Sequence, residues 1–464
     1  MLDKLKEECG VFAIFGSNDA AVNTALGLHA LQHRGQEAGG IVTCKNNQFY
    51  MHFADGLVGD NFNSADVVEK LKGDIAIGHV RYSTAGKKSA RNYQPIFAEF
   101  SFGSLAVAHN GNLTNAAILR KKLIARGSIF QSTMDTEVII HLIALSKKDT
   151  LVDKIIDAVK QIEGAYSLVI MHKNGVVALR DPFGVRPLVL GKLGSANVVA
   201  SETCALDIIG ADFVRDVKGG EMVIIDKNGI ESIKPFDAKP SKFCIFEYIY
   251  FARPDSVLEG KSVYQMRKNI GIQLAKETKI DADIVVPVPD SGVPAAIGYA
   301  MQAQIPFELG IIRNHYVGRT FIEPSDKIRH FGVKLKHNAN AALIKGKRVI
   351  LVDDSIVRGT TSKKIVQMIK DAGAKEVYML IASPPTTDPC FYGVDTPERK
   401  DLMAANHEIE EMARMIGVDK LAYISPDGLY KAVGEEKRDA KNPQYCDACF
   451  SGNYPINLTD KLNG

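Results

Sequence analysis

The chain has 464 residues, of which 46% are hydrophobic and 24% are charged, and its formal net charge is +3. These values are ordinary for a globular enzyme of two or three domains, and the small net charge argues against nucleic acid or a membrane as the main partner. No apolar run reaches the roughly 18 residues needed to cross a bilayer. Seven cysteines, an odd number, do not suit a secreted disulfide framework, so we expect a cytoplasmic protein.

The first eight residues, MLDKLKEE, are mostly charged, and an apolar strand begins abruptly at Cys9 with CGVFAIFG. Taken alone, Cys9 would be a small buried residue at the edge of a strand. Polar groups then follow buried strands in residues 75–86 and 105–115, and they accompany a glycine-rich segment at 31–40 and an amphipathic helix start at 134–143. Polar groups placed directly after buried strands are typical of an assembled site.

Together these segments resemble the class II glutamine amidotransferases, whose glutaminase domains have the N-terminal-nucleophile hydrolase fold, a four-layer αββα sandwich. The resemblance implies that Cys9 is the nucleophile and that its own α-amino group is the base. An α-amino group titrates near ~8, close to a thiol at ~8.5, whereas a peptide nitrogen is not basic. We therefore expect residues 1–8 to be a propeptide that is cut off before Cys9.

The same resemblance assigns the groups that bind glutamine. Arg81 would clamp the substrate α-carboxylate with its planar guanidinium, and Asp135 would hold the α-ammonium group. The side-chain amide of Asn110 and the backbone N–H of Gly111 would form the oxyanion hole. Taken singly, Arg81 or Asp135 could equally be half of a surface ion pair.

Short apolar strands alternate with glycine turns from about residue 165 to 235, and they include SLVIM, VVAL, NVVAS and EMVII. We interpret them as the second sheet of the glutaminase domain, which would span residues 9–235. Cys44 and Cys204 have no matching partner, and we expect them in the core.

A Lys- and Pro-rich segment at 234–242 is the expected linker to a second domain of residues 243–464. In that domain long helices, such as Tyr264 to Thr278, alternate with apolar strands at 282–292 and 306–312. This rhythm predicts an α/β domain with a parallel sheet and with ligands at the carboxyl ends of its strands. No G-x-x-x-x-G-K-[ST] loop is present, which argues against a nucleoside-triphosphate hydrolase.

The most informative stretch is residues 347–362, KRVILVDDSIVRGTTS, before a helix expected from Lys363 to Ala372. Gly359 lets backbone N–H groups crowd onto an anion, and three hydroxyl side chains add donors at the positive end of that helix: Thr360, Thr361 and Ser362. The acidic pair Asp353-Asp354 would repel a phosphate unless it faced the hydroxyls of a ribose and a hydrated Mg²⁺. The pattern predicts a site for a sugar that carries a 5′-phosphate.

This stretch resembles the signature of type I phosphoribosyltransferases, which bind phosphoribosyl pyrophosphate (PRPP). Without the resemblance it could be a strand, a surface turn and an N-capped helix of any doubly wound domain. The resemblance implies that Ser291, Asp353 and Asp354 hold one Mg²⁺ per subunit. It also implies a set of PRPP-binding residues: Asp290, Arg319, Asp353, Asp354, Ser355, Gly359, Thr360, Thr361 and Ser362.

A glutaminase fused to a phosphoribosyltransferase resembles the family of enzymes that open de novo purine (IMP) biosynthesis. The resemblance implies glutamine hydrolysis at Cys9 and a sealed path for ammonia to PRPP, giving 5-phosphoribosylamine, glutamate and pyrophosphate. Two alternatives are a class II amidotransferase with another acceptor and a PRPP-sensing regulator without catalysis. Tyr82, Tyr316 and Ile322 match positions that line the ammonia path, although ordinary packing would also explain them.

The polar stretch 313–326 matches the loop that closes over PRPP in this family, near which the purine nucleotides AMP, GMP, ADP and GDP inhibit. Arg313-Asn314-His315 stands where we would expect Lys-Asn-Arg, and a histidine is mostly neutral at pH 7. We therefore expect feedback inhibition that weakens as the pH rises. The family also implies a homotetramer, with no nucleic-acid or membrane partner.

Four cysteines lie in the second half: Cys446 and Cys449 form a C-x-x-C unit, and Cys244 and Cys390 lie upstream. Four thiolates would complete a ligand set for Zn²⁺ or for a [4Fe–4S] cluster, and the C-x-x-C pair could also be a redox motif or chance. One branch of the family carries a [4Fe–4S] cluster on cysteines at matching positions, and another branch lacks them. The resemblance therefore implies one cluster per subunit, which would link the end of the chain to the domain boundary.

Overall fold

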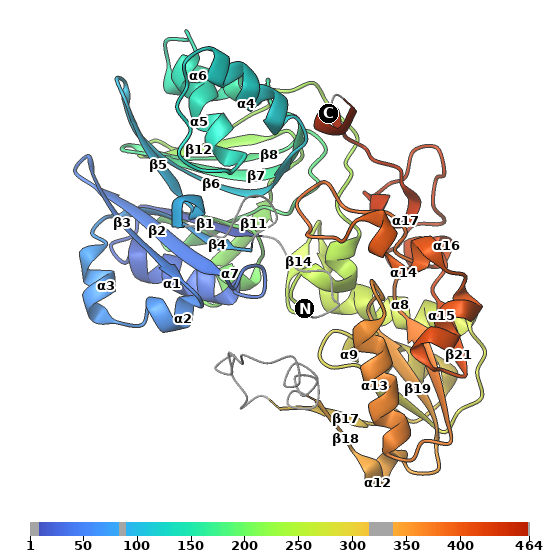
Figure 1. Ribbon diagram of the computed structural model, residues 1–464. Coiled ribbons are helices and arrows are strands. Elements are labelled where there is room, and N and C mark those ends of the chain that lie inside the picture. The colour runs from blue at the N-terminus through green and yellow to red at the C-terminus, as the bar shows by residue number, and fades with distance from the viewer. Residues whose placement is uncertain (1–8, 83–89, 315–336, 463–464) are drawn as a thin grey trace.

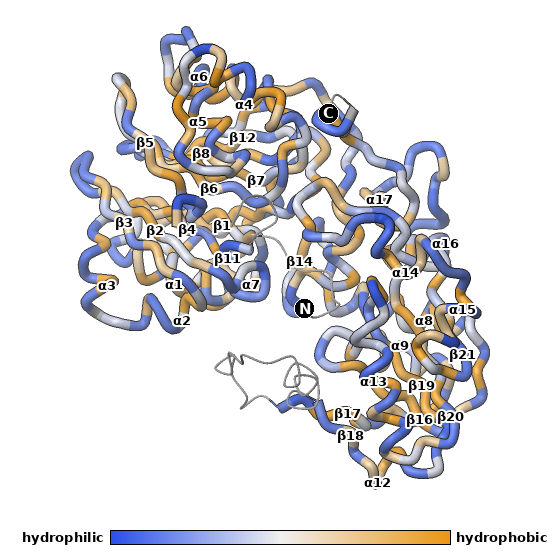
Figure 2. Tube along the Cα trace, viewed as in Figure 1, coloured by the Kyte–Doolittle hydropathy of each residue, from blue (hydrophilic) through white to orange (hydrophobic). Residues whose placement is uncertain are grey.

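The computed structural model describes residues 9–82, 90–314 and 337–462, which form two halves (Figure 1). The first half contains two stacked antiparallel sheets with helices on their outer faces. The second half contains a parallel sheet between helices. Apolar residues follow the strands of both halves, and polar residues occupy most of the outer loops (Figure 2). None of the described helices is long and apolar enough to span a membrane.

The first sheet has seven strands in the order β11-β9-β10-β1-β4-β2-β3, and the second has six in the order β13-β12-β8-β7-β6-β5. The strands of the first sheet are β1 (Gly10–Phe15), β2 (Ala38–Lys45), β3 (Gln48–Asp55), β4 (Ile75–Arg81), β9 (Val189–Leu193), β10 (Ala196–Ala200) and β11 (Asp212–Asp216). Those of the second sheet are β5 (Ile96–Phe100), β6 (Gly103–Leu113), β7 (Gly164–His172), β8 (Gly175–Arg180), β12 (Met222–Asp226) and β13 (Gly229–Ile233).

Alternating side chains create the layers of this half. In β1, Val11 and Ala13 join the core between the two sheets, whereas Phe12 and Ile14 face the helices of the first sheet. The helices beside the first sheet are α1 (Ala20–Ala30), α2 (Val58–Asn61), α3 (Ala65–Lys70) and α7 (Cys204–Asp207). Those beside the second sheet are α4 (Ala116–Ala125), α5 (Thr136–Leu145) and α6 (Leu151–Val159). The predicted four-layer αββα sandwich is confirmed.

One sequence-based interpretation of this half is wrong. We expected the strands between residues 165 and 235 to form one sheet, but β10 pairs with β1 of the first sheet, with Phe12 opposite Ala200. Residues 181–188 carry the chain from β8 in one sheet to β9 in the other. Both sheets bury apolar strands on two faces, so hydrophobic patterning alone does not tell to which sheet a strand belongs.

The second half is built on the parallel strands β16 (Ile284–Pro287), β19 (Arg348–Asp353), β20 (Glu376–Ile381) and β21 (Lys420–Tyr423), in that order. Val349 and Leu351 share a core with α13 (Thr360–Asp371) and α15 (Ile409–Ile416). Ile350 and Val352 belong to the core on the other face, with α8 (Val263–Glu277), α9 (Val293–Ala303) and α16 (Pro426–Ala432). The predicted parallel sheet is confirmed.

The strand expected at residues 306–312 is mostly irregular. Only β17 (Ile311–Arg313) is a strand, and it pairs antiparallel with β18 (His337–Ala339) instead of joining the parallel sheet. Phe307 touches the parallel sheet through a single bridge to Val285. The Gly310 N–H bonds to the carbonyl oxygen of Glu308, so a tight turn interrupts the strand.

A buried ion network joins the two halves. Arg34, from the first half, donates to Glu202 and to Glu247 Oε2 at 2.6 Å, and Arg186 donates to Glu247 Oε1 at 3.1 Å. Glu247 begins the short π-helix η2 (Glu247–Phe251), where the second half starts. All four side chains are at most 1% exposed. Removing one partner of such a network typically costs about 3–5 kcal/mol, so it fixes how the halves meet.

Candidate active site

Cys9 lies directly before β1, next to the end of β4. The two strands pair with Gly10 opposite Val80, which places Cys9 beside Arg81. The Cys9 Sγ atom lies 3.7 Å from the carbonyl oxygen of Tyr82, and Cys9 and Arg81 are both buried. The fold therefore brings together two residues that are 72 positions apart and that the sequence assigns to one site.

Asn110 and Gly111 lie in β6, in the facing sheet. His79 Nε2, in β4, donates to the carbonyl oxygen of His109 at 3.1 Å, which joins the two sheets at this point. The bond lies two residues before Arg81 and one residue before Asn110. The two sheets thus carry the expected nucleophile and the expected oxyanion hole to the same region.

The side chain of Asn110 is fully buried, and neither its oxygen nor its nitrogen has a hydrogen-bond partner among the described residues. Such groups are rare, because an unpaired buried polar group costs about 1–3 kcal/mol. Gly111 has a φ of +141°, and a Cβ atom there would lie 2.0 Å from the carbonyl oxygen of Ala165, so only glycine fits. A buried amide side chain without a partner among the described residues is a donor that an oxyanion hole could use.

The Asp135 carboxylate is fixed by the strand that carries Asn110. The Leu113 N–H donates to Asp135 Oδ2 at 2.9 Å, and His109 Nδ1 lies 3.6 Å from Oδ1. Burial acts to raise the pKa of Asp135, but the charge of His109 and hydrogen bonds from His109, Leu113 and Thr136 outweigh it and hold the pKa below its ordinary value. Burial lowers the pKa of His79 to about 3, so that ring stays neutral.

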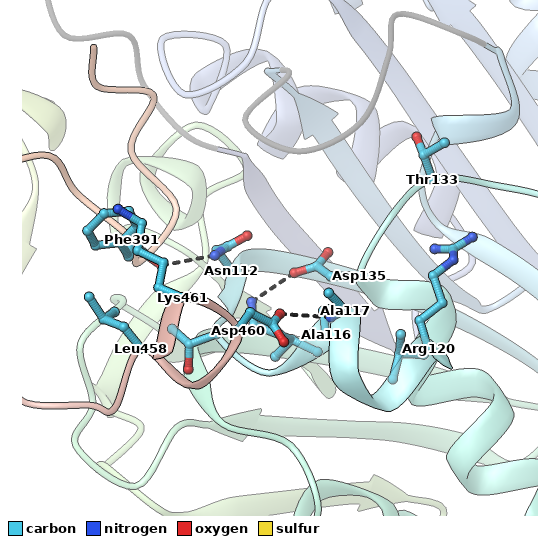
Figure 3. A pocket seen from close by; sticks show the side chains of 13 residues that line it. Asn112, Ala116, Ala117, Arg120, Thr133, Asp135, Phe391, Leu458, Asp460 and Lys461 are labelled. Atoms are coloured by element: carbon cyan, nitrogen blue, oxygen red, sulfur yellow. Dashed lines mark hydrogen bonds between the residues drawn. The ribbon is translucent and has the colours of Figure 1, made fainter. Parts of the chain in front are cut away.

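A pocket opens beside Asp135, and both halves of the chain contribute to it (Figure 3). Its polar or charged lining residues are Asn112, Thr114, Arg120, Thr133, Asp135, Asp460 and Lys461, and its apolar ones include Leu113, Val138, Phe391 and Leu458. The Asn112 side-chain amide donates to the carbonyl oxygen of Phe391 at 2.9 Å. An ionised carboxylate in such a pocket suits a substrate ammonium group.

The second predicted site forms at the carboxyl ends of β16 and β19. These strands pair with Pro287 opposite Val352, so the turn after β16 meets Asp353 and Asp354. Both carboxylates are buried, and Asp354 accepts hydrogen bonds from the Ser291 hydroxyl and, at 2.8 Å, from the Ser355 hydroxyl. The structure therefore brings the three residues expected to hold Mg²⁺ to one edge of the sheet.

The predicted phosphate loop leads from these carboxylates into α13. Gly359 is the N-cap residue, with a φ of +77°, a left-handed conformation that other residues rarely adopt. Three residues with hydroxyl side chains form the first turn of the helix: Thr360, Thr361 and Ser362.

Asp290 pairs with Arg313 on the surface, a contact that the sequence did not predict. Arg319, Tyr316, Ile322 and His315, to which we assigned roles from the sequence, lie outside the described residues, as does the segment 1–8.

The four cysteines of the second half line one cavity, together with Arg186, Phe246, Phe251 and Tyr392. The backbones of Cys244 and Cys446 pair in an isolated parallel β-bridge, which joins the C-terminal part of the chain to the start of the second half. Burial and the neighbouring cysteines raise the pKa of the Cys446 and Cys449 thiols. The described part of the chain holds no group of three or more His, Cys, Asp or Glu residues that could bind a metal ion. Cys44 and Cys204 are core residues, as predicted.

Sequence reasoning missed the polar residues that support the site. His79 and His109 join the two sheets, and each is a lone histidine within an apolar strand, in IAIGHVR and LAVAHNG, which is a signal that could have been used. Arg34 lies in the glycine-rich segment 31–40 and Glu202 in SET, residues 201–203, and we assigned no role to either residue. Asp460 gave no signal, because its contacts lie more than 340 residues away.

Comparisons with known proteins agree with this geometry. The glutamine amidotransferase domain family matches residues 79–207, and the phosphoribosyl transferase domain family matches residues 255–389. An amidophosphoribosyltransferase of Rhizobium etli is 57% identical over 465 residues, which cover 99% of this chain and 94% of that protein. That of Bacillus subtilis is 49% identical and covers 98% of this chain and 95% of its own length.

The chain belongs to the amidophosphoribosyltransferase family. The solved glutamine PRPP amidotransferase of B. subtilis, in complex with ADP and GMP, matches with a TM-score of 0.92 and 47% identity, covering 97% of this chain and 98% of that one. The prediction of a glutamine-dependent amidophosphoribosyltransferase of purine biosynthesis is thereby confirmed.

Proposed function

We propose that this amidophosphoribosyltransferase hydrolyses glutamine at Cys9 and passes the ammonia to PRPP in its second half. Cys9 Sγ attacks the amide carbon, the C–N bond breaks, and ammonia leaves with the thiol proton. Water then releases glutamate from the thioester. In the second half the ammonia nitrogen bonds to C1 of PRPP, the bond from C1 to pyrophosphate breaks, and a proton is released. The product is 5-phosphoribosylamine.

The observation that carries this proposal is the buried amide of Asn110, which has no partner among the described residues. Asn110 lies in β6, a strand of the facing sheet that contacts β1, and Cys9 directly precedes β1. An amide donor and the Gly111 N–H would stabilise the negative oxygen that forms when the thiol attacks. Arg81 and Asp135 would then bind the carboxylate and ammonium groups of glutamine.

Replacing Asn110 with alanine tests this proposal. Loss of one oxyanion donor lowers kcat by about 10²–10³-fold, so we expect that loss for the glutamine-dependent reaction. The reaction driven by ammonium salt should stay within about twofold, because it needs no oxyanion hole. Asn197→Ala, in β10 away from the site, is the matched control. An equal loss with both nitrogen sources, or no loss with either, would contradict the assigned role.

For the second half we propose that Asp353 and Asp354 bind the ribose of PRPP and, with Ser291, one Mg²⁺. Their oxygen atoms suit Mg²⁺, which prefers carboxylate ligands and retains several waters. When bound, the ion would neutralise charge on the pyrophosphate group. The backbone at Gly359 and the hydroxyls of Thr360, Thr361 and Ser362 would hold the 5′-phosphate. Asp290, Ser355 and Arg319 would complete the PRPP site.

We also propose that Cys244, Cys390, Cys446 and Cys449 hold a [4Fe–4S] cluster. All four line one cavity, and burial raises the pKa of the Cys446 and Cys449 thiols, which disfavours their thiolate forms unless positive charge compensates. A zinc ion on the same four thiolates is the alternative to the cluster.

Metal analysis tests the cluster. We expect anaerobically purified protein to be brown and to contain about four iron and four sulfide per chain. Cys449→Ser should lower both contents and the visible absorbance, whereas Cys44→Ser, at a buried position in β2, should leave them unchanged. A colourless protein with one zinc per chain would reverse the assignment.

The remaining proposals concern processing and regulation. We propose that residues 1–8 are removed before Cys9, so active protein whose mass includes Met1 would contradict this step.

We propose domains of residues 9–235 and 243–464, a homotetramer in the cytoplasm, and inhibition by AMP, GMP, ADP and GDP. The B. subtilis relative solved with ADP and GMP supports the nucleotides.

A further inference from the structure

The C-terminal segment, residues 454–462, returns to the first half and ends beside α4 (Figure 1). It is anchored next to Cys390 on the way: the Tyr454 hydroxyl donates to the carbonyl oxygen of Pro389, and the Tyr392 hydroxyl bonds to both backbone groups of Ile456. Its short helix α18 (Thr459–Leu462) then forms one wall of the pocket that contains Asp135 (Figure 3). The C-terminal segment therefore lies against the first half, which carries the proposed glutamine site and is called the glutamine half below.

The start of α4 lacks the usual local cap. Its N-cap residue, Asn115, makes no capping bond with its side chain. The side-chain nitrogen of Asn115 instead donates to the carbonyl oxygen of Gln161 at 3.0 Å, and its oxygen accepts from the Glu163 N–H at 3.0 Å. The first N–H groups of α4 thus need an acceptor from elsewhere.

Asp460 supplies that acceptor. Its Oδ2 accepts from the Ala117 N–H at 2.8 Å and its Oδ1 from the Ile118 N–H at 3.0 Å. These are the second and third helical positions, which a local N-cap side chain would otherwise satisfy. The Asp460 N–H also donates to the carbonyl oxygen of Thr114 at 2.8 Å. A negative charge at this helix end is favourable as well.

The capped segment continues directly into the site. Thr114 follows Leu113, whose N–H donates to Asp135, and both follow Gly111 in the same chain segment. Leu113 also pairs with Gly164 of β7, and the Thr114 N–H donates to the carbonyl oxygen of Glu163 at 2.8 Å. Loosening of the first turn of α4 would therefore reach the Leu113–Asp135 bond through the Thr114 carbonyl group that Asp460 holds. The effect of Asp460 would therefore be felt where the substrate ammonium group binds.

We propose that Asp460 is a positioning residue for glutamine: it caps α4 from the far end of the chain and so holds Asp135 in place. The proposal rests on the function proposed above. It makes the C-terminal segment a part of the glutamine half, because that half does not complete its own helix start.

The test measures both nitrogen sources in Asp460→Ala and Asp460→Asn. We expect Asp460→Ala to raise the KM for glutamine about two- to thirtyfold, the range that loss of a cap permits, with a smaller change in kcat. The ammonia-dependent reaction and its KM for PRPP should stay unchanged. Asp460→Asn should have a KM for glutamine close to that of wild type, because asparagine also caps helices.

Glu436→Ala removes the same charge from an exposed position of the C-terminal part and should behave as wild type. Amide hydrogen exchange of residues 112–118 should speed up in Asp460→Ala, with the melting temperature close to that of wild type. If Asp460→Ala does not fold, amide hydrogen exchange is compared between Asp460→Asn and wild type instead. If the Ala117 and Ile118 amides of wild type are not protected from exchange, the proposal is overturned. An unchanged KM in folded Asp460→Ala also overturns it. Wild type that cannot use glutamine would instead refute the proposed function.

Discussion

Replacing Cys9 with alanine is expected to abolish 5-phosphoribosylamine formation from glutamine, with a loss of at least about 10⁴-fold. Alanine offers no nucleophile, and the other described residues assigned to this site carry no thiol that could attack the amide carbon. The reaction with ammonium salt should stay within about twofold of wild type, because it bypasses the first half. Initial rates with each nitrogen source, at pH 8 where some ammonia is unprotonated, measure the two reactions separately.

Cys44→Ala is the matched control for this variant. Cys44 is also a buried cysteine of the first sheet, but it belongs to the core between the sheets. Its loss should cost about 1 kcal/mol of stability and leave both reactions intact. Glutamine-dependent activity that survives in Cys9→Ala, or an equal loss of both reactions, would refute the role of Cys9.

Replacing Asp354 with asparagine should have the second largest effect, and it should fall on both nitrogen sources alike. Asparagine keeps the shape, and its oxygen can still accept from one of the two hydroxyls of Ser291 and Ser355 while its nitrogen donates to the other, but it removes a negative charge from the proposed Mg²⁺ and ribose site. Loss of several kcal/mol of charge stabilisation corresponds to about 10²–10³-fold in rate. Steady-state rates at saturating PRPP and Mg²⁺ with glutamine, and then with ammonium salt, check this result.

Asp371→Asn, at the other end of α13, controls for the change of charge, because Asp371 is exposed and bonds only to Gln367 among the interactions described for it. It should leave both rates unchanged. A variant at Asp354 that retains ammonia-dependent synthesis would show that this carboxylate is a structural acceptor for two hydroxyl groups and not part of the PRPP site.

The sequence predicted those parts of the fold and site that depend on local patterns. Residues 347–362 place a buried strand, a carboxylate pair, a glycine turn and a helix in order, and each element forms as expected. The register of neighbouring strands then explains why Cys9 meets Arg81 and why Ser291 meets Asp354. The roles of these residues stay predictions until the variants are measured.

Features that depend on long-range pairing were not predictable in the same way. The pairing of β10 with β1, the single bridge at Phe307 and the ion network around Glu247 are decided by tertiary contacts. Asp460 lies in a short polar segment whose sequence shows no motif, and only the structure shows that it caps a helix of the other half. Spacing alone likewise did not show that four scattered cysteines share one cavity.

The most direct test of the central claim, that nitrogen released in one half is captured in the other, follows the nitrogen itself. Wild-type protein is given glutamine labelled with ¹⁵N in its amide, together with PRPP, Mg²⁺ and unlabelled ammonium that exceeds the ammonia released but is too dilute to drive the ammonium reaction, and the 5-phosphoribosylamine is trapped for mass spectrometry. We expect most of the product to carry ¹⁵N, because ammonia inside the protein does not mix with the solution. Product whose label matches the diluted pool, or glutamine that is never hydrolysed, would contradict the account.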